Sequence, residues 1–185
     1  MTDDVLRQQF EDLSYPFDQW THRAHVRLAF IYLGNHSFAE AMERLRTGIK
    51  AYNEKNQVPE GPLSGYNETT TYAFLILVAA TMSAYGKLLE TPDSDSFCDR
   101  HTRLMNRNVL RLFYSPAQRS HPDAKTKFVE PDLAPPCQRS SILPITSNIC
   151  YKCNYGTRSD QYWSVARRKV MSDQKATISR FTHQY

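Results

Sequence analysis

The sequence predicts an all-α protein: a helical bundle of about four principal helices, with an extended Pro-rich wrap and a poorly ordered basic C-terminal tail. Apolar residues recur at helical spacing in several stretches before residue 115. No stretch before residue 136 alternates polar and apolar residues as a strand does. Short loops that contain Pro or Gly separate the helical stretches, which favours a bundle.

The first two helices are predicted from apolar spacing and from the residues that end them. Residues 3–13 form a short leading helix, which Pro16 breaks. The second helix is expected to run from about Thr21, its N-cap, to Leu33, and Gly34 supplies the stop.

Two histidines lie at the start of this second helix. Its apolar stripe comprises Val26, Ala29, Phe30 and Leu33. Extending the stripe backwards by three and four residues reaches His22 and His25. We therefore expect both imidazoles to point toward the core side of the helix.

The third and fourth helices have clear start signals. The stretch "SFAE" is a capping box, in which Ser37 caps the helix and Glu40 reaches back to it. After a loop with two prolines, Asn67 or Thr69 is expected to start a long helix that reaches about Leu89. Because this helix is apolar nearly all round in its middle, it should lie at the centre of the bundle.

The chain divides into a helical domain, residues 1–136, and a tail, residues 137–185. Residues 96–114 predict one helix, or two with a break near Asn106, and residues 115–136 hold five prolines and predict the extended wrap. The tail carries eight Lys and Arg against two Asp, whereas the preceding residues carry fifteen Lys and Arg against seventeen acids. Scattered apolar residues and one-signed charge predict that the tail is disordered.

The composition favours a soluble, cytoplasmic protein. The first residues, "MTDDVLRQQF", lack the basic start and apolar stretch of a secretory signal. The longest apolar run, residues 73–84, is shorter than the roughly 20 residues that cross a bilayer. We therefore expect no membrane partner. Without a secretory signal, a disulfide framework is disfavoured for the four cysteines.

Three ordered motifs carry a resemblance to a known group. They are "THRAHVRLAFIYL", "GYNETTT" and "FYSPAQRSHPDAKTKFVEPDLAPP". In this order they resemble a group of small, largely uncharacterised helical proteins of bacteria and fungi, with H-x-x-H, Y-H-E-T and F-V-E-P-D-L motifs. The resemblance covers roughly residues 10–136 and implies kinship rather than a particular chemistry.

The sequence departs from the group's pattern at one position. Where the group resembles Tyr-His-Glu-Thr, this chain has Tyr66, Asn67, Glu68 and Thr69. Asn is a poor ligand for transition metals. If the group's histidine is a ligand or a base, the site is therefore weaker here or its function has changed.

The histidines and carboxylates suggest a metal site. His22 and His25 lie on one helical face, and Glu68 begins another helix. Zinc or iron requires about three such protein ligands, with an open position for catalysis. Glu130 and Asp132 could add a ligand or orient the imidazoles.

Two other interpretations use the same residues. In metal-free acid–base catalysis, His25 is the base, Glu68 orients it, and Tyr66, Asn67 and Thr69 contact the substrate or support the site. Alternatively, the two histidines hydrogen-bond to Glu68 and Asp132 in a buried polar network without catalytic function.

Two tail motifs are weaker. "CYKC", residues 150–153, has the spacing of half a zinc knuckle but lacks two well-placed further ligands, which favours unpaired thiols. "RRK", residues 167–169, with neighbouring aromatics suits nucleic acid or an acidic surface, yet short basic tails are usually solvated, and the acidic body disfavours DNA binding as the main role.

These observations lead to two functional hypotheses. The first is a small intracellular enzyme that acts on a small organic molecule in metabolism or biosynthesis, with metal-assisted or acid–base chemistry. The alternative is a non-catalytic helical binding or accessory protein that diverged from such an enzyme. The chain has no P-loop, dinucleotide fingerprint or G-x-S-x-G motif, which disfavours those reaction classes. The sequence does not set the oligomeric state.

We predict that residues 137–185 are dispensable for stability. They lack a continuous apolar stripe, so burial cannot offset an ordering cost of about 1–2 kcal/mol per residue. A chain ending at Pro136 should unfold at nearly the same temperature as the full chain in a calorimetric scan. A fall of more than about 8 °C would show that the tail belongs to the domain.

Overall fold

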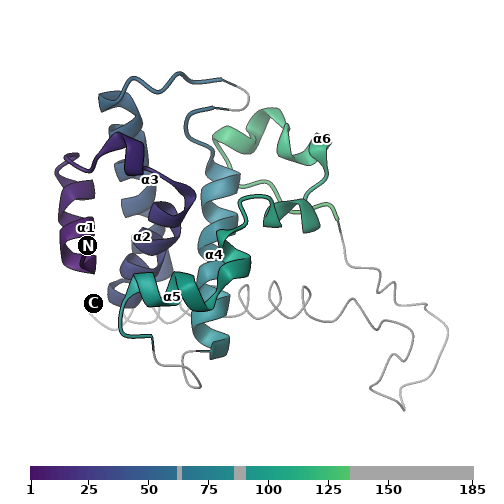
Figure 1. The fold of residues 1–185 in the computed structure, drawn as a ribbon. Coiled ribbons are helices and arrows are strands. Elements are labelled where there is room, and N and C mark those ends of the chain that lie inside the picture. Colours follow the sequence, from purple (N-terminus) through teal and green to yellow (C-terminus); the bar gives the residue numbers. More distant parts are fainter. Residues whose placement is uncertain (62–63, 86–90, 134–185) are drawn as a thin grey trace, which may run out of the picture.

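The computed structural model describes residues 1–61, 64–85 and 91–133, and the fold is all-α, as the sequence predicts (Figure 1). The α-helices are α1 Asp3–Glu11, α2 His22–Asn35, α3 Phe38–Lys55, α4 Glu68–Tyr85, α5 Ser94–Arg100 and α6 Pro116–Arg119. The 3-10 helices are η1 Phe17–Gln19, η2 Thr102–Met105, η3 Val109–Leu112 and η4 Pro122–Lys125. No β-strand forms among the described residues. No helix in these ranges has the length and apolar character to span a bilayer.

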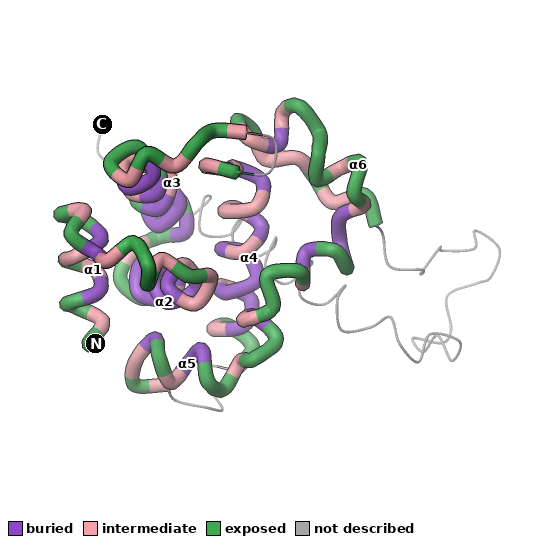
Figure 2. The backbone as a smooth tube through the Cα atoms, turned by 45° about the horizontal axis from the view of Figure 1, so that its top comes forward, coloured by how far each residue is buried: buried purple, intermediate pink, exposed green. Residues whose placement is uncertain are grey.

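Helix α2 packs against helices from both earlier and later parts of the chain. It contacts α1, α3, α4, α5 and η2. Its buried apolar residues are Ala24, Val26, Leu28, Ala29, Ile31 and Tyr32. Figure 2 shows that buried residues gather along α2, α3 and α4, whereas the segment around α6 is largely exposed. The predicted central position of α4 is confirmed by its many buried residues, which include Ala73, Leu75, Leu77 and Val78.

A buried arginine ties the outer helices to α2. The Nε of Arg27 donates to Ser94 Oγ at 2.7 Å, and its Nη2 donates to the backbone oxygen of Met1 at 2.9 Å. The Ser94 hydroxyl in turn donates to the carboxylate of Asp3 at 2.5 Å. A buried cation is costly unless its donors are satisfied, and these contacts satisfy the guanidinium while joining the starts of α1 and α5 to α2.

The helix starts follow the sequence closely, and one predicted stop does not. The capping box of Ser37 and Glu40 is present at the start of α3. Asn67 caps α4, because its Oδ1 accepts the backbone N–H of Thr70 at 2.8 Å. Thr21 precedes α2 without a capping hydrogen bond from its side chain, and α2 continues through Gly34 to Asn35. Glycine permits a helix stop but does not impose one.

The described chain after α4 forms several short helices, in place of the one or two longer helices and the extended wrap that the sequence predicts. The predicted break near Asn106 is confirmed, but α5 is short and the 3-10 helices η2 and η3 follow it. The Pro-rich wrap is extended only after residue 125, because Pro116 and Pro122 each occupy the first turn of a short helix. The predicted end of the fourth helix near Leu89 and the predictions for residues 137–185 lie outside the described residues.

Candidate functional site

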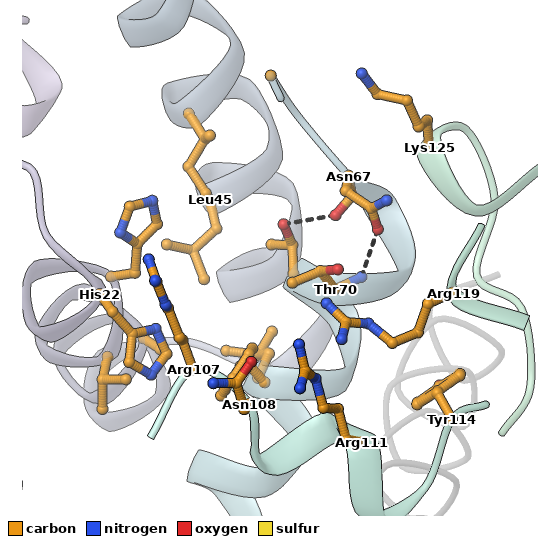
Figure 3. A pocket seen from close by; sticks show the side chains of 18 of the residues that line it. His22, Leu45, Asn67, Thr70, Arg107, Asn108, Arg111, Tyr114, Arg119 and Lys125 are labelled. Atoms are coloured by element: carbon orange, nitrogen blue, oxygen red, sulfur yellow. Dashed lines mark hydrogen bonds between the residues drawn. The ribbon is translucent and has the colours of Figure 1, made fainter. Parts of the chain in front are cut away.

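A cleft of about 1010 Å³ lies between α2, the first half of α4 and the segment of residues 107–125 (Figure 3). Its apolar lining comprises Val26, Ala29, Leu45, Ile49, Phe74, Leu75 and Val78, with Gly65 and Pro116. Its neutral polar lining comprises Ser64, Asn67, Thr70, Thr71, Asn108, Tyr114 and Ser120. Its basic lining comprises His22, His25, Arg107, Arg111, Arg119 and Lys125. No Asp or Glu of the described residues lines it.

Both predicted histidines line this cleft. The ring of His25 packs against Trp20 with ring centroids 4.0 Å apart, and the ring of His22 meets Phe74 edge-on at 4.7 Å. The Nδ1 of His25 lies 2.8 Å from the backbone oxygen of Thr21. Because a carbonyl only accepts hydrogen bonds, Nδ1 carries the proton and Nε2 of the neutral ring keeps its lone pair.

The environment keeps His25 neutral. Burial lowers the pKa of His25 to about 4, and the hydrogen bond to the Thr21 carbonyl only partly opposes this effect. Burial also lowers the pKa of His22, whose Nε2 donates to the backbone oxygen of Leu104 at 2.7 Å. The positive charge of Arg107 lowers the pKa of His22 further. Both rings therefore present an unprotonated nitrogen at neutral pH.

Glu68 binds other residues, so the predicted site of His22, His25 and Glu68 is not formed. The guanidinium of Arg46 binds its carboxylate through two hydrogen bonds, Nε to Oε2 at 3.0 Å and Nη2 to Oε1 at 2.6 Å. The hydroxyl of Tyr66 donates to Oε2 at 2.7 Å. Glu68 is buried and does not line the cleft.

The residues therefore do not fit the metal site that the sequence suggested. In the described ranges, no group of three or more His, Cys, Asp and Glu side chains is arranged to hold a metal ion. The hydrogen bonds from Arg46 hold the pKa of Glu68 below its usual value, against the effect of burial. The carboxylate is therefore the partner of Arg46. The predicted hydrogen bond by which Glu68 would orient His25 is also not formed.

The remaining predicted residues have structural partners. Asn67 lines the cleft as the cap of α4, whereas Tyr66 faces Glu68. The Oγ1 of Thr69 donates to the backbone oxygen of Lys127 at 2.9 Å and accepts the N–H of Val129 at 3.0 Å. Thr69 thus holds the "FVEPDL" segment against α4.

Glu130 and Asp132 lie on this segment and are both exposed. The backbone oxygen of Glu130 accepts from Gln118 Nε2 at 2.7 Å, and the carboxylate of Asp132 accepts the N–H of Ser115 at 2.8 Å. Neither residue lines the cleft, so the predicted hydrogen bonds from the histidines to Asp132 are not formed.

Sequence reasoning missed three arginines. Arg107 lies between η2 and η3, Arg111 lies in η3, and Arg119 ends α6. A sequence signal was present, because residues 101–122 contain four arginines and no Asp or Glu. The signal was concealed by averaging charge over the whole helical domain, which is slightly acidic.

These arginines differ from Lys125 in how their charge is balanced. Lys125 forms an ion pair with Glu60 and donates to the backbone oxygens of Gly61 and Ser64 at 2.9 and 2.8 Å. None of the ion pairs between described residues involves Arg107, Arg111 or Arg119. Among the described residues, no ion pair therefore balances the positive charge of these three exposed guanidinium groups.

Comparison with models of known protein families, with curated proteins and with solved structures finds no match. The resemblance of the three motifs to the group with H-x-x-H and F-V-E-P-D-L motifs thus stays a prediction.

We predict that Glu68→Gln destabilises the protein by about 1.5–3 kcal/mol, the usual range for a hydrogen bond to a charged group. Arg46 would lose its buried partner and keep only the exposed Glu43. Because the pKa of Glu68 is lowered, its contribution is present above the unfolded pKa of about 4.3 and is lost as the pH falls. Urea unfolding at pH 7 and at pH 3.5 measures both effects.

Glu43→Gln is the matched control, since it removes the exposed partner of the same arginine. It should cost less than about 1 kcal/mol. Equal losses in the two variants would contradict the assignment of Glu68 as the buried anchor.

A second prediction concerns His25 and pH. Its folded pKa of about 4 lies below the ordinary value of 6.5, so the unfolded chain binds more protons between these values. Stability should therefore fall as the pH is lowered from about 6.5 to about 4, by on the order of 3 kcal/mol from this residue, at 1.36 kcal/mol per pKa unit. In His25→Asn, which can keep the donor to Thr21, this part of the slope should disappear from urea titrations. Parallel curves for the two proteins would contradict the prediction.

Proposed function

We propose that this protein is a small intracellular enzyme that binds a small organic anion in the cleft and uses His25 as a general base. The observation that supports it best is the composition of the cleft lining, in which uncompensated arginines and neutral imidazoles meet without a carboxylate among the described residues. Positive charge attracts an anion, and the absence of nearby acids leaves that charge available to it.

The shape and lining of the cleft suit a small molecule. Ligand pockets commonly measure about 300–1,000 Å³ and combine apolar walls with a few polar groups. Here α2, α3 and α4 contribute an apolar floor that includes Val26, Leu45 and Phe74. Segments 64–71 and 107–125 contribute the polar and charged rim. Such a division orients a ligand with its anionic group toward the rim.

His25 is suited to accept a proton once the anion is bound. Its Nδ1–H is held by the Thr21 carbonyl and its ring by Trp20, so the position of Nε2 is fixed. Nε2 has no hydrogen-bond partner in the part of the chain that the structure describes. A nearby negative charge favours the protonated ring, so the substrate raises the pKa of His25 from its low value in the free protein toward the range useful for catalysis.

One observation favours the non-catalytic alternative. One nitrogen of each imidazole is hydrogen-bonded to a backbone carbonyl, and within residues 1–61, 64–85 and 91–133 no carboxylate is hydrogen-bonded to either ring. A binding protein would use the same cleft to hold an anion without proton transfer. Turnover separates the two functions, whereas binding does not.

The proposal is tested with a panel of dicarboxylates, phosphorylated sugars and nucleotides. A compound that binds the native state raises the melting temperature, by about 2.7 kcal/mol of added stability at a hundred times its Kd. We expect at least one compound to bind and to be consumed, or to exchange a proton for solvent deuterium, in NMR spectra. In His25→Asn, turnover or exchange should fall at least about a hundredfold, the usual contribution of a positioned base.

His36→Asn is the matched control, because His36 follows the other end of α2 and does not line the cleft. It should keep full activity. Binding without turnover in the unaltered protein would establish the alternative. No binding of any compound in the panel would refute both functions.

A further inference from the structure

We propose that the anion held at the rim of the cleft is a phosphate group, bound between Arg111 and Arg119 at the N-terminal end of α4. This inference rests on the proposed function and names the class of its substrate, a small phosphorylated molecule. The observation behind it is the way two arginines from different short helices face the first turn of a long helix across one cleft (Figure 3).

The two arginines reach the cleft from separate elements. Arg111 lies in η3 and Arg119 at the end of α6, and both line the cleft. Figure 3 shows their side chains extending into the cleft toward Thr70, next to the cap residue Asn67. Bringing two cations to one place without a carboxylate between them is unfavourable in the empty protein, and a bound anion removes this cost.

The N-terminal end of α4 adds to the positive electrostatic potential at the two arginines. This helix has 18 residues, so its N-terminal end carries a partial positive charge. Its one acid in the first turn is Glu68, and Arg46 and Tyr66 bind that carboxylate outside the cleft. The helix end therefore faces the arginines without a negative side chain of its own. Thr70, Thr71 and Ser120 supply further polar lining.

This arrangement suits a phosphate better than a single carboxylate. One guanidinium fork satisfies both oxygens of a carboxylate, whereas a phosphate monoester offers three oxygens and up to two charges. Two forks that approach from different directions match the larger, tetrahedral group. Arg107 lies on the His22 side of the cleft, where its charge acts on that ring. It is placed to contact the rest of the ligand, and Lys125 is already paired with Glu60.

The test compares three aromatic anions in isothermal titration at low salt. Phenyl phosphate is the probe, phthalate is a dicarboxylate with the same number of charges, and benzoate carries one carboxylate. We expect phenyl phosphate to bind at least about tenfold more tightly than phthalate, and benzoate to bind most weakly. Inorganic phosphate should compete with phenyl phosphate. Added salt should weaken binding, because the arginines are exposed.

Variants of the two arginines then test where the phosphate group binds. Arg111→Gln and Arg119→Gln should each weaken phenyl phosphate binding about tenfold, while Arg111→Lys and Arg119→Lys, which keep the charge but lose the fork, should weaken it less. Arg103→Gln is the matched control, since Arg103 lies in η2 and does not line the cleft. Circular dichroism melting confirms that each variant is folded.

The outcomes separate this inference from the proposed function. The phosphate site is overturned if phthalate and phenyl phosphate bind equally well. It is also overturned if both arginine variants bind phenyl phosphate as tightly as the unaltered protein. Either result is compatible with an enzyme that acts on another organic anion. Preferred binding of a short single-stranded oligonucleotide over phenyl phosphate, with the same dependence on Arg111 and Arg119, also overturns it, because the phosphate would then belong to a nucleic acid backbone. Failure of all three aromatic anions and of inorganic phosphate to bind overturns the inference, and the anion panel with His25→Asn then decides the proposed function.

Discussion

The ion pair between half-buried Arg46 and buried Glu68 sets both the packing of α4 and the charge of the cleft. Two hydrogen bonds and the Tyr66 hydroxyl hold the carboxylate against α3. Because these contacts satisfy the carboxylate, the first turn of α4 can be buried beside α3. The same contacts remove the one acid of that turn from the cleft, so no carboxylate of the described residues lines the cleft beside the arginines. The Glu68 side chain thus stabilises the packing of α4 and, under the proposed function, also affects anion binding.

The ordered motifs of the sequence meet in space, but for structural reasons. Thr69 of "YNET" binds the backbone of Lys127 and Val129, so the "FVEPDL" segment is anchored on the start of α4. The "THRAH" histidines lie across the cleft from this anchored pair of segments. Several residues that resemble a ligand set instead hold together the segments around the cleft. The motifs are therefore close in space, although Glu68, Glu130 and Asp132 do not join the histidines in the cleft.

Two kinds of basic residue line the cleft, and their roles differ with burial. His25 is packed against Trp20 and held neutral by its surroundings, so its nitrogen is fixed in place. The arginines are exposed and have no carboxylate partner in the described ranges, so their side chains can adjust to a ligand. Under the proposed function, this arrangement would hold the substrate by its anionic end while a fixed base acts at another atom.

The sequence by itself determined the first four α-helices, several of their starts and the placement of His22 and His25 beside the core. Capping boxes and apolar spacing act over three or four residues, so they can be recognised without a fold. Which acid meets which base is decided by the angles and registers of whole helices, and this is why Glu68 was assigned to His25 although it binds Arg46. The arginine cluster likewise required η3, α6 and α4 to converge. Tertiary structure decided the site because charges interact through space, and separation along the chain does not set that distance.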